Sequence, residues 1–230
     1  MPEVIEITVY QFDELTKRAQ AHARDWYREA SSHDEWWDYV YADFEAICIC
    51  FGIELKRVPI NRHKPTGGCR PCIWFSGFSQ QGDGASFEGS WRYEKGMCHA
   101  IRTYAPTDTV LHQIADQLQA AQKPNFYQLV ADISQSGNYY HEYTMRIIIQ
   151  RDAPANQEIF RDTEAAVIEA MRALARWLYR RLEAEYEHVN SDEVVAEMIV
   201  GNDYTFTGDG ARFGYRARST EANRTGGKHD

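Results

Sequence analysis

Five polar residues in and around one glycine-rich segment carry the side chains that acyl-transfer chemistry uses. They are Ser76, Asp83, Ser86, Glu88 and His141. A serine, a histidine and a carboxylate can act as one unit in any chain order, because such triads depend on geometry. The G-x-S-x-G turn that presents the nucleophile of many hydrolases is not in the sequence. A small hydrolase or ligand-binding protein is therefore the alternative function, and we assign no catalytic residue.

A second set of candidates opens an expected helix in which acidic and aromatic residues interleave without Lys or Arg. The binding residues expected there are Asp34, Glu35, Trp36, Trp37, Asp38 and Tyr41. At helical spacing, Trp37 and Tyr41 share one face of that helix and Asp38 adjoins it. Aromatic residues of this kind anchor many protein interfaces. The segment predicts an acidic contact surface for a basic partner; the alternative is a core face with a solvated acidic side.

One cysteine pair, Cys69-Arg-Pro-Cys72, is the candidate for metal chemistry. A zinc ion would need two further ligands, for which His63, Cys98 and His99 are available. Structural zinc sites usually show two close ligand pairs, and here there is one. We therefore expect unpaired thiols, no metal and no cofactor.

The glycine-rich segment is expected to form a β-hairpin with strands over 72–78 and 85–93. Strict alternation in the second strand places Phe87 in the core, with Ser86 and Glu88 on the opposite, polar face. This polar row and the turn beside it form the candidate binding platform. The alternative interpretation is a structural hairpin with one wet face.

Hydrophobic periodicity and turn residues predict the remaining elements. Helices are expected over 13–30, 33–51, 97–104, 107–122, 154–188 and 191–201. Asp13 and Thr107 are the expected N-caps of the first and fourth helices, and Gly52 is expected to end the second. The long helix has an apolar stripe of Val167, Met171, Leu174, Leu178 and Leu182. Further strands are expected over 4–10, 53–60, 126–134, 139–150 and 204–207, with a loop over 61–71. His141 would then share a strand face with two tyrosines, and the apolar run 147–149 indicates a central strand covered on both faces.

This order of elements predicts one α+β domain over residues 1–214, followed by a disordered polar and basic tail over 215–230. The domain would have a mainly antiparallel sheet with flanking helices, one of them long and near the C-terminus. A helix of that length either wraps around the domain, breaks or reaches into a partner. A homodimer is therefore one of the expected assemblies.

Four motifs together resemble a family of short bacterial and phage-associated proteins often described as antitoxins of toxin–antitoxin stability systems. The motifs are FSGFSQQGDGASFEGSW (75–91), YAPTD (104–108), GNYYHE (137–142) and NDYTFTGDGARF (202–213). The resemblance extends over most of residues 10–214. It implies a phage or mobile-element setting and a protein partner, either a toxin or a host defence complex such as CRISPR. It brings no catalytic residues with it.

Charge and hydropathy narrow the classes of partner. The net charge of −9 over 230 residues repels phosphates, so direct nucleic-acid binding is disfavoured and a nucleic-acid-binding regulator is a lesser alternative. No apolar run is long enough to span a membrane, and the N-terminus does not have the pattern of a secretory signal. We expect a protein of the bacterial cytoplasm that acts by binding another macromolecule.

Overall fold

The computed structural model describes residues 6–31, 35–60, 68–152, 159 and 161–214. Contacts between residues group the chain into two compact units, each described by itself: residues 1–34 with 188–230, and residues 35–187. The predicted α+β class, with antiparallel sheets and a long helix near the C-terminus, is confirmed. The expected single domain over 1–214 stays a prediction, and the tail over 215–230 lies outside the described residues.

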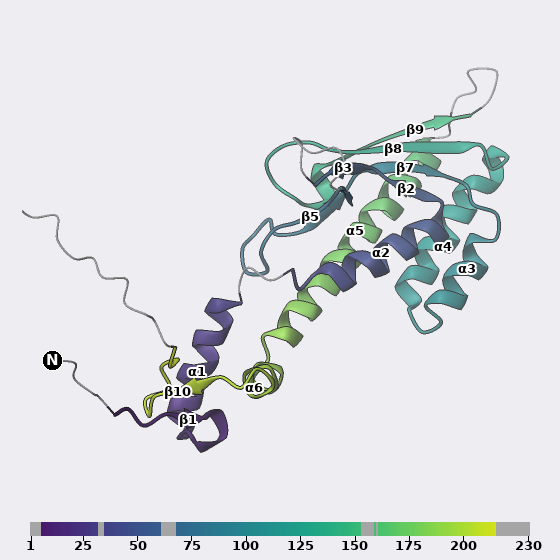
Figure 1. Cartoon of the computed structure of the whole chain (residues 1–230). Coiled ribbons are helices and arrows are strands. Elements are labelled where there is room, and N and C mark those ends of the chain that lie inside the picture. Colours follow the sequence, from purple (N-terminus) through teal and green to yellow (C-terminus); the bar gives the residue numbers. More distant parts are fainter. Residues whose placement is uncertain (1–5, 32–34, 61–67, 153–158, 160, 215–230) are drawn as a thin grey trace, which may run out of the picture. The chain divides into compact units, whose positions relative to one another are not determined.

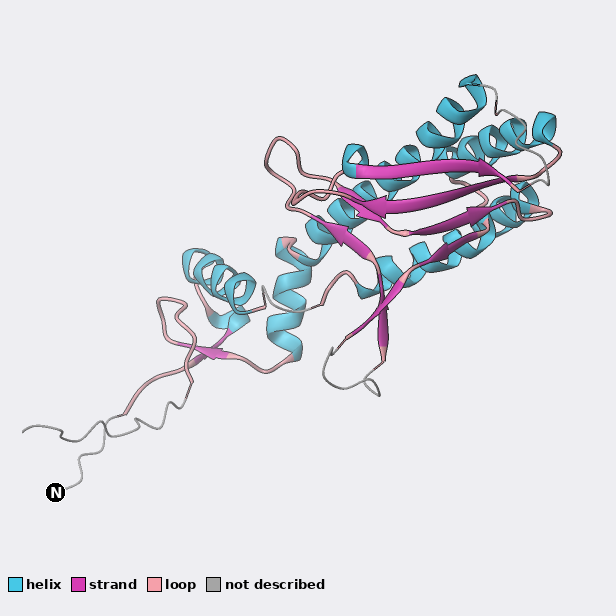
Figure 2. Ribbon diagram, turned by 90° about the horizontal axis from the view of Figure 1, so that it is seen from above, coloured by secondary structure: helices cyan, strands magenta, loops and turns pink. Residues whose placement is uncertain are grey.

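The larger unit, residues 35–187, is built on a four-stranded antiparallel sheet (Figure 1). Its strands, in spatial order, are β2 (Ile53–Leu55), β7 (Gly89–Arg92), β8 (Leu129–Gln135) and β9 (Met145–Arg151). The helices on one face of the sheet are α2 (Asp38–Phe51), α3 (Met97–Tyr104), α4 (Thr109–Gln122) and α5 (Arg161–Val189). Figure 2 looks onto the other face of this sheet, with the helices behind it.

The core lies between the sheet and these helices, and its pattern follows from the sequence. Leu129, Ala131 and Ile133 of β8 point to one side and are buried. Asp132 and Ser134 point to the other side and are exposed. The predicted stripe of α5 is fully buried and comprises Val167, Met171, Leu174, Leu178 and Leu182. One face of the sheet therefore packs against the helices, and the other is exposed to solvent.

Two short ribbons extend the unit beside the main sheet. One pairs β3 (Arg57–Pro59) with β4 (Cys69–Pro71), and the other pairs β5 (Ile73–Phe75) with β6 (Ala85–Phe87). Part of the expected loop over 61–71 is thus strand β4, while 61–67 lies outside the described residues.

Two strands predicted as continuous, 53–60 and 85–93, break at Lys56 and Glu88, and Cys72 likewise separates β4 from β5. The Lys56 amide donates to the Glu88 carbonyl at 2.9 Å, and the Glu88 amide donates to the Cys72 carbonyl at 2.9 Å. The Cys72 amide closes the ring by donating to the Lys56 carbonyl at 2.7 Å. At this junction the chain leaves one sheet for another while its backbone groups stay hydrogen-bonded, so a strand pattern alone does not reveal the break.

The β8–β9 connection is longer than the turn over 135–138 that the predicted strands leave between them. It runs from Ser136 to Thr144 and contains the 3-10 helix η3 (Glu142–Thr144). The expected strand face carrying His141 is therefore wrong, because His141 lies in this connection. The doubly covered central strand is also wrong: β9 is at the sheet edge, and Ile148 is 39% exposed.

Helix ends were partly predicted. Gly52 ends α2 in the left-handed region with φ of 75°, as expected of a C-terminal glycine. Asp108, not Thr107, caps α4, because its carboxylate accepts from the amides of Val110 and Leu111. The second helix begins at Asp38, later than predicted.

The smaller unit pairs two helices beside a two-stranded ribbon. Its elements are β1 (Tyr10–Gln11), the 3-10 helix η1 (Phe12–Glu14), α1 (Lys17–Ala30), α6 (Asp192–Gly201) and β10 (Thr205–Phe206). Thr16 caps α1 in place of the expected Asp13, since the chain first makes the 3-10 turn. Among the described residues, no helix combines the length and apolar character needed to cross a membrane.

Candidate functional site

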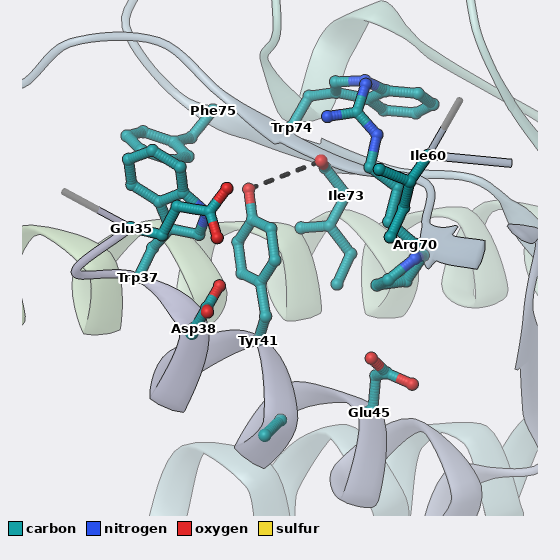
Figure 3. A pocket seen from close by; sticks show the side chains of 12 residues that line it. Glu35, Trp37, Asp38, Tyr41, Glu45, Ile60, Arg70, Ile73, Trp74 and Phe75 are labelled. Atoms are coloured by element: carbon teal, nitrogen blue, oxygen red, sulfur yellow. Dashed lines mark hydrogen bonds between the residues drawn. The ribbon is translucent and has the colours of Figure 1, made fainter. Parts of the chain in front are cut away.

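An open pocket of about 550 Å³ lies in the larger unit, between the start of α2 and the β4–β5 segment (Figure 3). We call it the acidic–aromatic groove. Its α2 side is formed by Glu35, Trp37, Asp38, Tyr41 and Glu45, and its strand side by Ile60, Arg70, Ile73, Trp74 and Phe75. Four residues predicted to bind, Glu35, Trp37, Asp38 and Tyr41, therefore line one cavity.

Helical spacing explains the α2 wall of the groove. Asp38, Tyr41 and Glu45 follow each other at three- and four-residue intervals and face the strands, while Phe44 is fully buried in the core. The Tyr41 hydroxyl donates to the Ile73 carbonyl at 3.4 Å, which links the two walls. Burial raises the pKa of Tyr41, so the phenol stays protonated and can act as this donor.

Aromatic contacts hold the mouth of the groove. The rings of Trp36 and Trp37 meet edge-on with centroids 5.5 Å apart, and both approach Phe75, at 5.6 and 5.7 Å. Phe75 in turn stacks on Phe78 at 5.7 Å. Such edge and offset contacts fix ring positions at small entropic cost on binding. Trp36 contacts Trp37 but is not part of the groove lining, and Asp34 lies outside the described residues.

The charges of the groove are separated. Glu45 is paired with Arg57 at 2.6 Å. Glu35 and Asp38 are exposed, and no Lys or Arg of the described residues forms an ion pair with either. Arg70 comes from the strand side, and its guanidinium lies beside Trp74 over the middle of the groove (Figure 3). The groove therefore has an acidic end at Glu35 and Asp38 and a basic group on its strand side.

The polar residues of the glycine-rich hairpin serve mainly to hold its turn. Ser76 Oγ accepts from the Gly84 amide at 3.0 Å and donates to the Tyr140 carbonyl at 3.3 Å. The Asp83 carboxylate accepts from the amides of Ser79 and Gln80, at 2.9 and 2.7 Å. These bonds satisfy turn backbone groups, as Asx-type turns do.

Ser86 is not on a solvent-facing row, contrary to the prediction. It is fully buried, and its Oγ has no hydrogen-bond partner among the described residues. The β8–β9 connection covers that face: Tyr140 stacks on Trp74, the cross-strand partner of Ser86, with centroids 5.9 Å apart. A Cβ added at Gly84 would lie 2.7 Å from Cδ2 of His141, so the connection packs tightly there.

The histidine and the glutamate have partners other than Ser86. The Glu88 carboxylate binds Lys56 Nζ at 2.6 Å and the Gln135 amide at 3.2 Å. His141 Nδ1 lies 3.3 Å from the Tyr143 amide and 3.0 Å from the Glu142 carboxylate. No hydrogen bond joins Ser86, Glu88 and His141 within the described structure, so the arrangement is not that of a catalytic triad.

The sequence reading missed the strand side of the groove. Arg70 falls in the predicted loop over 61–71, and Trp74 and Phe75 fall in the predicted strand over 72–78. The signal that could have found them is the run of three large apolar residues from Ile73, because a strand exposed on one side cannot bury all of them. Trp74 and Phe75 are both only half-buried.

The cysteine pair does not gather further ligands. Cys69 is exposed in β4, whereas Cys72 is buried, and burial raises the pKa of the Cys72 thiol. Among the described residues, no three His, Cys, Asp or Glu side chains are grouped to hold a metal ion. His63 lies outside the described residues.

Comparison with protein families gives one match. Residues 36–192 match the family described as Domain of unknown function (DUF8835). The chain belongs to this family. The DUF8835 match begins within the acidic–aromatic groove and extends through α5, so it covers nearly all of the larger unit and little of the smaller one. No curated protein and no solved structure matches the chain.

Proposed function

We propose that this protein acts by binding another protein, and that the acidic–aromatic groove is the contact surface. The observation that carries the proposal is an open cavity of about 550 Å³ that joins four of the residues expected to bind. Fixed aromatic rings flanked by carboxylates without an ion-pair partner in the described structure suit an interface anchor. In the proposed setting, a bacterial cytoplasm invaded by a phage or mobile element, the partner is a toxin or a host defence complex such as CRISPR.

The alternatives have less support. A hydrolase centred on Ser86 would need an accessible hydroxyl beside a base, whereas this hydroxyl is buried and has no hydrogen-bond partner in the part of the chain that the structure describes. A nucleic-acid-binding regulator would have to overcome a net charge of −9, and Glu35 and Asp38 at the groove would repel phosphates. Binding to a protein is consistent with both observations.

The test is affinity capture from the bacterial host with the full chain and two matched variants. Glu35→Lys combined with Asp38→Lys reverses the charge at the acidic end without touching the core, since both residues are exposed. Tyr39→Ala changes an 85%-exposed residue of the same helix that does not line the groove. We expect a stoichiometric partner to be lost from the first variant and retained by the second.

Loss from both variants, or from neither, would contradict the proposed surface. Light scattering of the purified chain decides whether the partner is a second copy. A homodimer that survives the charge reversal would place self-association elsewhere on the molecule.

A further inference from the structure

We infer that the acidic–aromatic groove recognises an arginine side chain on an extended segment of its partner. The inference rests on the proposed function, and it specifies the chemistry of the occupant.

The acidic end of the groove offers two carboxylates to a cation. Arg57 already neutralises Glu45 at 2.6 Å, so Glu45 is not available in the same way. Glu35 and Asp38 have no cationic partner within the described part of the chain, and both side chains are exposed at the mouth. A cation could therefore pair with Glu35 and Asp38 without breaking an existing ion pair.

The rings beside these carboxylates select the kind of cation. Tyr41 lies between the two carboxylates and Ile73 (Figure 3), and Trp37 lines the same groove. A guanidinium is planar, is weakly hydrated, stacks on aromatic rings and presents a fork of donors to carboxylates. The ammonium of lysine is compact and strongly hydrated, so it stacks less well on aromatic rings and has no planar fork of donors for a carboxylate.

The rest of the groove accommodates the neighbours of that arginine. Its volume of about 550 Å³ is within the ~300–1,000 Å³ range of ligand sites and exceeds what one ion needs. Ile60, 65% exposed, and the half-buried Trp74 offer apolar contacts at the opposite end. Arg70 lies beside them and can donate to a carbonyl of the bound segment, which fixes the direction of that segment.

The experiment compares two peptides of the same length and shape that differ in one side-chain group, a charged guanidinium or a neutral ureido group. The probes are acetyl-Gly-Leu-Arg-Leu-Gly-amide and the same peptide with citrulline, a neutral isostere, in place of arginine. Binding to the full chain is followed by NMR through the tryptophan indole N–H signals, with Trp37→Phe used to assign the Trp37 signal. We expect the arginine peptide to shift the Trp37 and Trp74 signals and to bind about tenfold more tightly than the citrulline peptide.

A matched pair of variants separates local from general charge. Glu35→Gln combined with Asp38→Asn should weaken the arginine peptide about tenfold and leave the citrulline peptide unchanged. Glu54→Gln combined with Asp132→Asn removes the same charge from exposed strand positions outside the groove and should leave both affinities unchanged. Equal binding of the two peptides, or equal effects of the two variants, overturns the inference.

The two proposals fail in different ways. If a cellular partner depends on the groove but the peptides bind equally, the arginine inference falls and the proposed function stands. If the arginine peptide binds as expected while no cellular partner depends on the groove, the site chemistry stands and the proposed function falls.

Discussion

Lys56 and Glu88 are joined twice, once through the backbone and once through their side chains. The Lys56 amide donates to the Glu88 carbonyl at 2.9 Å, and Lys56 Nζ lies 2.6 Å from Glu88 Oε2. The two residues mark the points where β2 leads into β3 and β6 leads into β7. Glu88, a candidate binding residue by sequence, thus has a structural role at this junction.

Glu88→Gln is expected to lower stability slightly at neutral pH. The hydrogen bond and charge of Glu88 raise the pKa of Lys56, so the contribution of the pair is complete below about pH 10 and is lost as the pH rises further. Because the Lys56 side chain is 59% exposed, solvent screening limits the loss to about 0.5–1 kcal/mol. Urea unfolding at pH 7 and above pH 11 measures it; a constant difference across that range would contradict the ion-pair explanation.

Ser86→Ala is expected to be neutral or to stabilise the protein by up to about 1 kcal/mol. The substitution removes a fully buried hydroxyl that makes no hydrogen bond to any described residue, and so removes its desolvation penalty. Thermal unfolding gives the change in stability, and affinity capture should recover the same partner. Loss of partner binding or of an enzymatic activity in a stable Ser86→Ala protein would restore Ser86 as a functional residue.

Gly84→Ala is expected to destabilise the protein by about 1–3 kcal/mol, the usual range for overpacking. The new Cβ would lie 2.7 Å from His141 Cδ2 and 3.0 Å from His141 Cα, and the backbone atom can move only with the whole connection. Gly201→Ala is the control, because a Cβ there meets nothing within 4 Å. Equal melting temperatures for the two variants would show that the connection does not pack on Gly84.

Tyr104 is expected to ionise about two pH units later than a free phenol. A hydrogen bond to Asp43 at 2.6 Å, together with burial and the negative charge, raises the pKa of Tyr104 to about 12. The unfolded phenol titrates near 10, so any stability from this pair is complete below about pH 10 and declines as the pH approaches 12.

Ultraviolet titration of the wild type minus Tyr104→Phe isolates the Tyr104 signal. The same subtraction in an Asp43→Asn background should bring its midpoint down toward 10, because the charged acceptor is gone. An unchanged midpoint would mean that burial alone sets the pKa.

Local patterns in the sequence were sufficient to predict most helices. The spacing of Val167, Met171 and Leu174 predicted the buried face of α5, and Gly52 predicted the end of α2. Both signals are local: one follows from 3.6 residues per turn and the other from the backbone freedom of glycine. They are readable without knowing what the element packs against.

The strand signals were weaker because tertiary contacts decide where a strand ends. The local sequence does not distinguish Lys56 or Glu88 from the strand residues around them. The strands end at these residues because three segments of the chain exchange backbone hydrogen bonds there. Likewise, alternation gave the correct side for Phe87 but not the environment of Ser86, which depends on a connection about fifty residues away.

One side of the acidic–aromatic groove was predictable from the sequence, and the other was not. The sequence by itself determined an acidic, aromatic face on α2, since Trp37, Asp38 and Tyr41 are adjacent at helical spacing. Only the tertiary structure decided that Arg70 and Trp74 oppose that face, because a cavity requires two walls and the second wall comes from a distant segment of the chain. The composition of one wall is local information, whereas the shape between two walls is not.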